Sequence, residues 1–383
     1  MILAVFFPTD VSLENWIDTG WFDREKVIYE KYLAEGLLTG VVWFTYGKND
    51  GELAEHLQYQ KKLDSRLNVI SLPAVFDSPF GRMVYSFLLP LIQWKVLKNV
   101  DLLKTHQING SWSAVFVKFL YNKPLIVRCG HVSSLLLIHK RQKIQRKKGD
   151  DLAEQFAFKN ANHIFVPSRD ACEYVMERYG TEAYDITILP NYVDTGQFKH
   201  MFHQDFHRDH FVYVGRLAEE KNIFNLIQAA ADAEIVLHVY GEGPLLQELE
   251  YLVSKANAHV IFHGVVPHAE LPALLNHYKY FILPSVYEGM PKALLEAMAC
   301  GLICLGTNVP SINEIIQDQV NGFLIDGTEY DHILTAIERA QNVEATHIGQ
   351  NAIKTIEEQF SLEKISQQEA EIITKLAKEN RLL

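Results

Sequence analysis

The stretch that decides the fold of the second half is YFILPSVYEGMPKALLEAMACG, residues 280–301. Its apolar and aromatic residues up to Leu283 predict a strand, and a short loop follows. Pro291 suits the first position of a helix, and Gly301 suits the cap at its carboxyl end. A helix therefore begins at the carboxyl end of a strand, where its free N–H groups and its dipole form an anion site.

The same order of strand, loop and helix extends along the whole chain. Short β-branched or aromatic runs predict strands over residues 2–7, 40–45, 68–71, 102–105, 125–128, 163–166, 211–214, 235–240, 259–263, 280–283 and 302–306. Longer amphipathic stretches predict helices over residues 24–35, 150–160, 223–231, 245–256, 271–277 and 291–299. This alternation indicates the α/β class, with two doubly wound parallel sheets in series.

A break in the pattern marks the domain boundary. The turn residues of LPNYVD, residues 189–194, interrupt the apolar period, and we place the hinge near residues 190–208. Ligands of such sheets bind at the carboxyl ends of the strands, so two facing sheets predict a deep cleft. The expected parts are a first Rossmann-like domain over 1–195, a second over 205–360, and a helix over 361–383 that packs back on the first domain.

The composition excludes several classes of protein. The length of 383 residues and the hydrophobic content of 48% suit two globular cores. The net charge of −11 is uneven, because residues 1–195 hold 23 Lys and Arg against 22 Asp and Glu, and the remainder holds 13 against 25. This acidic balance disfavours a nucleic-acid partner. Four cysteines without a Cys-x-x-Cys pair argue against a zinc site and suit a reducing cytosol.

The apolar segments argue against a membrane span. The start, MILAVFFPTD, has no basic leader and is interpreted as a buried strand rather than a signal peptide. A spanning helix needs about 18 consecutive apolar residues. The nearest run, Val84–Trp94, is interrupted by Pro90 and is followed by Lys95. Contact with a membrane surface stays open.

Two carboxylates flank the expected helix start. Glu296 lies about 7–8 Å beyond Pro291 along the helix axis, at roughly 1.5 Å per residue, and its side chain tilts back toward the amino end of the helix. A phosphate at the helix start would leave Glu296 near a ribose, and a carboxylate can accept hydrogen bonds from both ribose hydroxyls. Glu288 could accept hydrogen bonds from the hydroxyls of a hexose in the same way. Gly289 lets a ligand approach the backbone. The alternative is that Glu288 caps the helix and Glu296 lies on the surface.

A second strand end carries two cations. In YVGRLAEEKN, residues 213–222, a glycine ends the strand, and Arg216 and Lys221 follow five residues apart. A planar guanidinium and an ammonium both suit a diphosphate. The alternative is a solvated turn in which Arg216 pairs with Glu219 or Glu220.

These stretches resemble the retaining glycosyltransferases of family 4, which have the GT-B fold of two Rossmann-like domains. The matching motifs are Pro-Asn-x-Val-Asp at 190–194, Gly-Arg-Leu-x-x-Glu-Lys at 215–221, Gly-Glu-Gly-Pro at 241–244, His-Gly-Val at 263–265, Glu-Gly-x-Pro-x-x-Leu-x-Glu-Ala at 288–297 and Asn-Gly-Phe-Leu at 321–324.

The resemblance implies a role for each matching residue. Arg216 and Lys221 would hold the diphosphate, and Glu296 would bind the ribose. Glu288 would contact the donor sugar, and the backbone of Val266 would meet the nucleobase. The other implied donor-site positions are Gly215, Gly243, Gly289, Met290, Pro291 and Leu295.

The chain also departs from the family pattern. Many members carry Asn in place of Lys292 and a Gly-Gly turn in place of Pro310 and Ser311. The first half lacks the family's Gly-Gly loop after the first strand, and we take Thr19 and Gly20 as its stand-in, in contact with the donor or acceptor.

The first half holds a histidine and a basic stretch. In VRCGH, His131 lies just beyond a strand, at the place of a family histidine near the reacting carbon. No acidic residue occurs between Asp101 and Asp150, whereas ten Lys or Arg do, six of them in Lys140–Lys148. Such a run is commonly a solvated face. The alternative is an anionic partner, either a lipid diphosphate acceptor or an anionic membrane surface, into which Phe80–Val96 could dip.

The expected activity is retaining transfer of a hexosyl unit from a nucleotide-sugar to a glycan or lipid-linked acceptor, in bacterial-type polysaccharide or glycolipid synthesis. UDP is the commonest donor nucleotide of the family. The expected catalytic residues are His131, Glu288, Arg216 and Lys221, and no metal is required because the cations would stabilise the leaving diphosphate. The expected location is the cytoplasm, peripheral on the inner face of the membrane. Two alternatives stay open, namely a sugar-nucleotide hydrolase or epimerase and a non-catalytic donor-binding partner.

Overall fold

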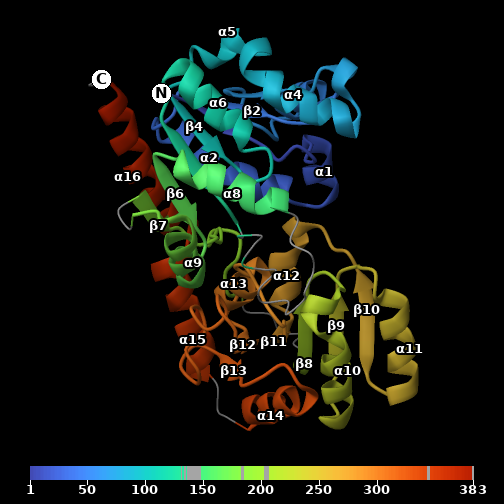
Figure 1. The fold of residues 1–383 in the computed structure, drawn as a ribbon. Helices are drawn as coiled ribbons and strands as arrows, with labels where there is room; N and C mark the ends of the chain where they lie inside the picture. Colours follow the sequence, from blue (N-terminus) through green and yellow to red (C-terminus); the bar gives the residue numbers. More distant parts are fainter. Residues whose placement is uncertain are drawn as a thin grey trace. The chain divides into compact units, whose positions relative to one another are not determined.

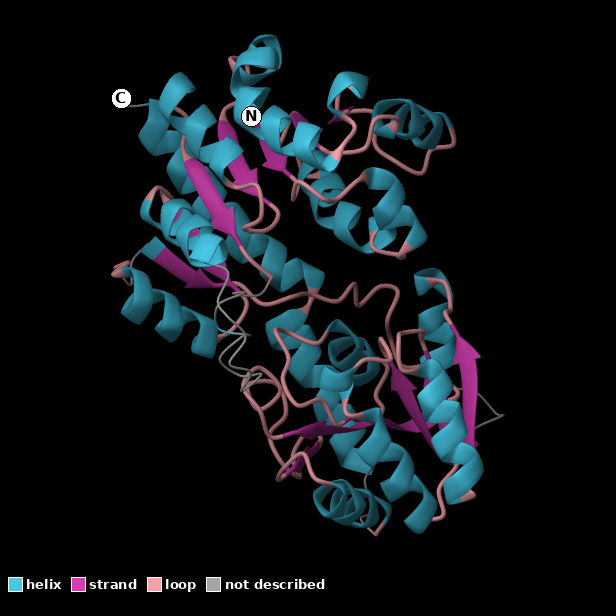
Figure 2. Ribbon diagram, turned by 45° about the vertical axis from the view of Figure 1, so that its right-hand side comes forward, coloured by secondary structure: helices cyan, strands magenta, loops and turns pink. Residues whose placement is uncertain are grey.

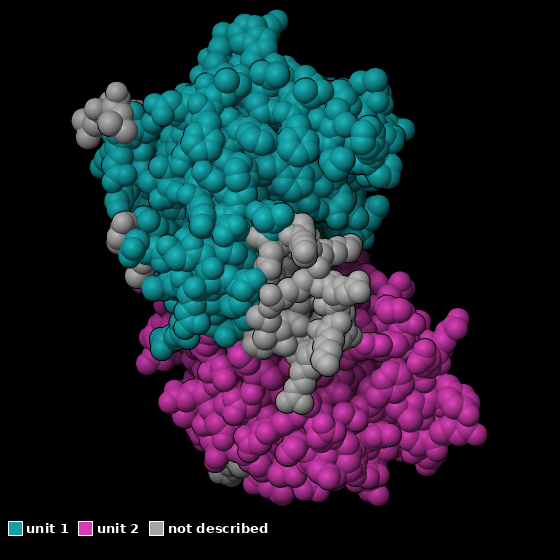
Figure 3. All heavy atoms as spheres, viewed as in Figure 1, with its two compact units in different colours: residues 1–189, 366–383 teal, residues 190–365 magenta. Residues whose placement is uncertain are grey.

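The chain divides into two compact units. The computed structural model describes residues 1–130, 132, 135, 148–182, 185–201, 207–342 and 346–381. Unit 1 comprises Met1–Leu189 and Ser366–Leu383, and unit 2 comprises Pro190–Ile365 (Figure 3). The backbone thus leaves unit 1 after Leu189 and returns to it at Ser366.

Unit 1 is built on a parallel sheet whose carboxyl strand ends all lie at one edge (Figure 1). The seven described strands are, in spatial order, β3 (Leu67–Ile70), β2 (Gly40–Phe44), β1 (Ile2–Phe6), β4 (Leu102–Thr105), β5 (Leu125–Arg128), β6 (His163–Val166) and β7 (Ile186–Ile188). All four residues of β4 and all four of β6 are buried, as expected of a parallel sheet covered on both faces.

Helices flank this sheet (Figure 2). They are α1 (Leu13–Asp18), α2 (Phe22–Ala34), α3 (Asp50–Tyr59), α4 (Pro79–Ile92), α5 (Trp94–Leu97), α6 (Trp112–Tyr121), α8 (Lys148–Lys159), α9 (Arg169–Tyr179) and α16 (Leu362–Arg381), with the 3₁₀ turn η1 (Ala74–Phe76) before α4. Helix α1 packs against α2 and α3, whereas α4, α6, α8 and α9 follow one another in a second row.

Helix α4 runs through Pro90, the residue that interrupts the apolar run Val84–Trp94 in the sequence. Ser78 caps the helix by accepting a hydrogen bond of 3.0 Å from the Gly81 N–H. Pro90 has no N–H to give to the carbonyl of Ser86, one turn earlier. That carbonyl instead accepts from Ser113 Oγ on α6 at 2.7 Å, so a tertiary hydrogen bond replaces the missing helical one. In the described part of the chain, no helix has the length and apolarity needed to cross a membrane.

The last helix is anchored in unit 1 by buried polar contacts. Tyr32 Oη donates to the Ser366 carbonyl at 3.2 Å. Lys104 Nζ on β4 forms an ion pair with Glu369 Oε1 on α16, and neither side chain is exposed. The ammonium also lies 5.1 Å from the centre of the Tyr29 ring, where a cation–π interaction is favourable. Burial lowers the pKa of Lys104, and the Glu369 carboxylate opposes that shift.

Unit 2 repeats the architecture with its own core. Its six described strands are, in spatial order, β10 (Val260–Gly264), β9 (Leu237–Tyr240), β8 (His207–Val214), β11 (Tyr278–Leu283), β12 (Ile303–Thr307) and β13 (Phe323–Ile325), all parallel. The helical elements are η3 (Glu219–Lys221), α10 (Ile223–Asp232), α11 (Leu246–Ala256), η4 (His268–Glu270), α12 (Leu271–Leu275), α13 (Lys292–Ala299), α14 (Tyr330–Gln341), α15 (Thr346–Thr355) and the π-helical η5 (Ile356–Phe360). The two parallel sheets confirm the predicted α/β class.

A row of histidines crosses three neighbouring strands of this sheet. His210 Nδ1 on β8 lies 3.0 Å from His238 Nε2 on β9, and His238 Nδ1 lies 2.9 Å from His263 Nε2 on β10. The ring of Tyr240 stacks on His263 with 4.3 Å between centroids. Burial lowers the pKa of His263. Each pair of nitrogens shares one proton, so one ring of each pair donates and the other accepts.

Candidate active site

Three loops meet at the carboxyl edge of the unit 2 sheet. They follow the neighbouring strands β9, β8 and β11. The Gly215 N–H, after β8, donates to the Tyr240 carbonyl at 2.9 Å, and the Val286 N–H, after β11, donates to the Glu220 carbonyl at 2.8 Å. The predicted cation-bearing loop and the predicted carboxylate-bearing loop are therefore joined through their backbones.

Two predicted site residues touch across these loops. Lys221 Nζ lies 2.5 Å from Glu288 Oε1, and the side chains are 19% and 9% exposed. Ser285 Oγ donates to the same carboxylate oxygen at 2.7 Å. Glu288 is thus held by two donors and does not cap the helix. Pro291 occupies the cap position of α13, with no side-chain hydrogen bond, so the helix begins at Lys292 and not at Pro291 as predicted.

Arg216 is arranged as the alternative interpretation expected. Its guanidinium lies 2.7 Å from Glu220 Oε1, and its side chain is 67% exposed. Its backbone is fixed, because the Arg216 carbonyl accepts from Tyr213 Oη at 3.0 Å. An exposed pair of this kind contributes little to stability, so exchange of Glu220 for a diphosphate would cost little.

Glycines allow the loops to pack backbone against backbone. A Cβ at Gly243 would lie 2.2 Å from the Leu217 carbonyl oxygen, and a Cβ at Gly241 would lie 2.0 Å from the Gly215 carbonyl oxygen. Gly241 also has a φ of +134°, which favours glycine. Any side chain at either position would displace the loop that carries Arg216.

Glu296 is buried and has a histidine partner that the sequence reasoning missed. His268 Nε2 on η4 lies 2.9 Å from Glu296 Oε1 on α13, and Glu296 is only 4% exposed. The alternative of a surface Glu296 is therefore wrong. His268 follows the predicted base-contacting Val266 by two residues, and that proximity was the available signal.

The remaining donor positions divide into half-buried and core residues. Gly289 and Val266 are half-buried, and Val266 packs against the core of unit 2. Leu295 is fully buried in that core, so its side chain is a packing residue rather than a ligand contact. Met290 is also buried, and its carbonyl accepts from Asn191 Nδ2 at 2.9 Å, which ties the start of unit 2 to the carboxylate loop.

The predicted residues of the first half are placed only in part. Thr19 ends α1, where its hydroxyl donates to the Asn15 carbonyl at 2.7 Å. Gly20 has a φ of +71° and forms the turn that leads into α2. His131 lies outside the described residues, and so does the basic stretch Lys140–Lys148 except for the backbone of Lys148.

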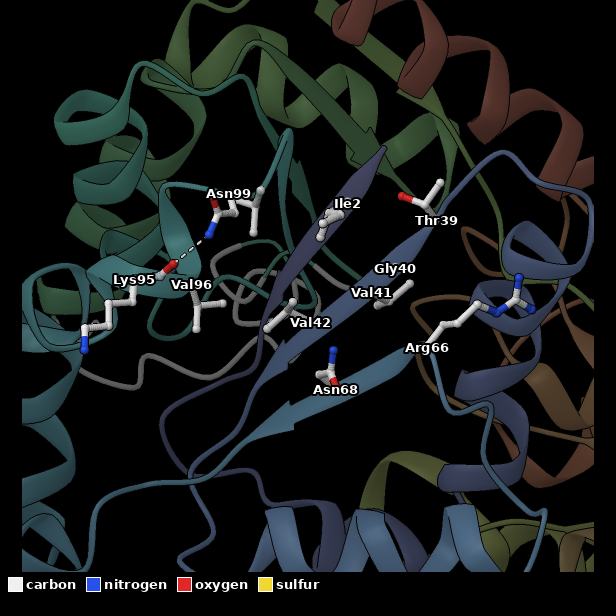
Figure 4. Close-up of a pocket in the computed structure, with 11 residues that line it drawn as sticks. Ile2, Thr39, Gly40, Val41, Val42, Arg66, Asn68, Lys95, Val96 and Asn99 are labelled. Carbon is white, nitrogen blue, oxygen red and sulfur yellow. Dashed lines mark hydrogen bonds between the residues drawn. The ribbon is translucent and has the colours of Figure 1, made fainter.

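A hollow of about 370 Å³ in unit 1 lies at the amino edge of the sheet (Figure 4). Ile2 and Gly40, the first residues of β1 and β2, line it together with Arg66. Asn99 Nδ2 donates to the Lys95 carbonyl beside it at 2.9 Å. Ligands of α/β sheets bind at the carboxyl ends, so this hollow at the amino ends is not the candidate site.

Two family models match the chain. The model described as Glycosyltransferase Family 4 matches residues 32–197, and the model described as Glycosyl transferases group 1 matches residues 202–355. The chain is a group 1 glycosyltransferase. The resemblance seen in residues 215–221 and 288–297 and the expectation of a transferase are both confirmed.

Two relatives of this glycosyltransferase each share about a quarter of the aligned residues with it. The UDP-Gal:alpha-D-GlcNAc-diphosphoundecaprenol alpha-1,3-galactosyltransferase of Escherichia coli is 26% identical over 215 residues, which cover 51% of this chain and 55% of the relative. The alpha-D-kanosaminyltransferase of Streptomyces kanamyceticus is 25% identical over 308 residues, which cover 72% of this chain and 78% of the relative. The chain therefore spans little more than half of the first relative's length.

Solved structures share the whole fold of this glycosyltransferase. HepE of Anabaena, solved in complex with UDP, has a TM-score of 0.77 at 16% identity and covers 98% of this chain and 100% of its own. Sucrose-phosphate synthase of Thermosynechococcus elongatus has a TM-score of 0.76 at 19% identity, with 98% and 99% covered. Identities this low show the fold alone, and that fold is the predicted GT-B.

Proposed function

We propose that this glycosyltransferase moves a hexosyl unit from a nucleotide-sugar to a glycan or lipid-linked acceptor, with retention of the anomeric configuration. The observation that carries the proposal is the contact of 2.5 Å between Lys221 and Glu288, at the carboxyl edge of the unit 2 sheet. It pairs a cation suited to a leaving diphosphate with a carboxylate suited to sugar hydroxyls.

The donor site is proposed to work by charge placement. Lys221 and Arg216 stabilise the negative charge that grows on the diphosphate as the sugar leaves, and the amino end of α13 adds its N–H groups. Glu288 binds the sugar, and Glu296, oriented by His268, binds the ribose. No metal is needed in this proposal, because the two cations take its electrostatic role.

The donor is proposed to be a UDP-sugar and the acceptor to be held by unit 1. HepE is solved in complex with UDP and with UDP-glucose, and the Escherichia coli relative is named for UDP-Gal and a diphosphoundecaprenol acceptor, which supports both halves of the proposal. His131, Thr19 and Gly20 are the proposed unit 1 contacts. The proposed place of action is the inner face of the cytoplasmic membrane, with Lys140–Lys148 toward anionic lipid.

The loss of one cation tests the donor site. Lys221→Met should lower kcat/KM by about 10²- to 10³-fold, the usual effect of removing one donor to a developing oxyanion. Lys255→Met is the matched control, because Lys255 is an exposed lysine on α11 of the same unit. A thermal-shift panel of UDP-, GDP- and ADP-sugars first selects the donor, since a ligand that binds the native state raises the melting temperature.

Three outcomes separate the alternatives. Release of free sugar from the donor without any acceptor would favour a hydrolase. Donor binding without turnover on glycan or polyprenyl-diphosphate acceptors would favour a non-catalytic binding protein. Near-normal turnover by Lys221→Met would contradict the assigned site, and inversion of the anomeric configuration in the product would contradict retention.

A further inference from the structure

Unit 1 carries a broad apolar surface on three neighbouring helices. Helix α4 packs on α6, and α6 packs on α8, so the three lie side by side (Figure 1). We call the outward surface of these helices the α4–α6–α8 face. The exposed apolar residues of these helices are Phe80, Met83, Phe87, Leu88, Leu91, Ile92, Phe116, Phe119, Leu120, Leu152 and Phe156.

The central apolar residues of this face lie against one another. The ring of Phe87 on α4 lies 5.8 Å from that of Trp112 and 5.9 Å from that of Phe116, both on α6. Phe116 in turn lies 5.9 Å from Phe156 on α8. These rings surround an apolar hollow of about 630 Å³, which Leu152 also lines. A patch of this continuity is more than the scattered apolar residues of an ordinary surface.

Helix α4 is apolar on both its inner and its outer side. Tyr85 and Leu89 face the core, as a helix of this layer requires. Phe80 and Leu91 point outward and are 71% and 62% exposed, and Met83 and Phe87 follow at helical spacing between them. A helix that is apolar on all sides is normally buried in a protein core or against lipid.

Exposed lysines lie beside two of these helices. Lys95 and Lys98 follow the carboxyl end of α4 and are exposed. Lys159 ends α8 and is also exposed. The acidic residues of α8 are Asp150, Asp151 and Glu154, and the buried Glu154 accepts from Tyr179 Oη at 2.6 Å.

An exposed tryptophan lies beside Lys98. Lys98 Nζ lies 4.9 Å from the centre of the Trp94 ring, and Trp94 is 48% exposed. Tryptophan and lysine together are typical of the boundary between lipid headgroups and acyl chains.

We propose that the α4–α6–α8 face docks onto the surface of an anionic phospholipid bilayer, with its rings among the acyl chains and Lys95 and Lys98 at the lipid phosphates. An apolar surface combined with cations of this kind lies in the membrane interface without spanning it. The docking rests on the proposed function only for its purpose, which is to bring unit 1 to a lipid-linked acceptor.

Vesicle co-sedimentation of the full chain tests the docking. The wild type should bind phosphatidylcholine vesicles that contain phosphatidylglycerol. It should bind vesicles of phosphatidylcholine alone much less. Leu91→Glu and Phe119→Glu should each weaken binding by about tenfold or more, because each removes a buried apolar side chain from the interface. Lys95→Gln and Lys98→Gln should each weaken it by about fivefold at low salt. Tyr59→Glu, at the end of α3, is the control, since Tyr59 is 87% exposed and α3 packs on α1 and β3.

Two results would overturn the docking. One is that the wild type does not bind anionic vesicles. The other is that Leu91→Glu and Phe119→Glu bind them as tightly as Tyr59→Glu does. A wild-type dimer that Leu91→Glu makes monomeric, without vesicle binding, would assign the face to a protein partner and equally refute the proposal. The melting-temperature shift with UDP-sugar, measured on the same proteins, reports on unit 2, so a failed donor site is distinguished from a failed membrane surface.

Discussion

Replacement of Glu296 gives a sharp test of the nucleotide site. In the proposed site this buried carboxylate accepts hydrogen bonds from both ribose hydroxyls, while its Oε1 stays within 2.9 Å of His268. A hydrogen bond to a charged group contributes about 1.5–3 kcal/mol, so two contribute about 3–6 kcal/mol. Because about 1.4 kcal/mol is tenfold in affinity, Glu296→Ala should weaken binding of the nucleotide by about 10²- to 10⁴-fold.

Calorimetric titration with UDP and with 2′,3′-dideoxy-UDP measures that interaction directly. The wild type should prefer UDP strongly, and Glu296→Ala should bind both nucleotides with the same weak affinity. Glu296→Gln should lie between them, since its amide keeps one acceptor and can still contact His268. Glu250→Ala, which removes an exposed carboxylate from α11, is the control. If Glu296→Ala keeps the wild-type preference for the hydroxylated ribose, the assignment of this carboxylate is wrong.

Three further predictions concern stability. Gly243→Ala should destabilise unit 2 by about 1–3 kcal/mol, because its Cβ would lie 2.2 Å from the Leu217 carbonyl oxygen, and an unchanged thermal midpoint would contradict the tight packing. Lys104→Met should cost about 3–5 kcal/mol in chemical denaturation by leaving the Glu369 carboxylate buried alone, whereas the double variant with Glu369→Leu should recover most of the loss, and no recovery would refute the pairing. The lowered pKa of His263 means that the unfolded chain binds its proton at a higher pH than the folded chain does. The contribution of His263 to stability is therefore complete above about pH 6.5 and decreases below it. Melting temperatures from pH 7.5 to 5 should show a slope that His263→Gln reduces, and an equal slope would exclude this histidine as the cause.

Hydrophobic periodicity predicted most of the described strands, because parallel strands are continuous apolar runs, whereas helices such as α3 and α9 were not predicted. The strands that it missed, β7 and β13, have three residues each, too few to show a period. Helix α4 was not predicted, and the donor that compensates for Pro90, Ser113, comes from another helix and leaves no local signal.

The site was predicted to the extent that its chemistry lies in short motifs. Lys221 and Glu288 are 67 residues apart, yet each follows a strand, and neighbouring parallel strands bring such loops together. His268 was missed because a lone histidine in a loop has no pattern. Leu295 was placed in the donor site by its motif, although its neighbour Glu296 already occupied the site-facing side of α13 and successive helical residues point in different directions.

The buried pair of Lys104 and Glu369 has a consequence for biosynthesis. The two residues are 265 positions apart, so the ribosome makes the whole of unit 2 before the partner of Lys104 emerges. Until then the nascent first unit contains an ammonium that its core cannot accept without a counter-charge. Its completion must therefore follow translation of the last helix. A gene cut after residue 189 should yield an incompletely folded fragment, whereas the same fragment with the last helix fused to it should fold.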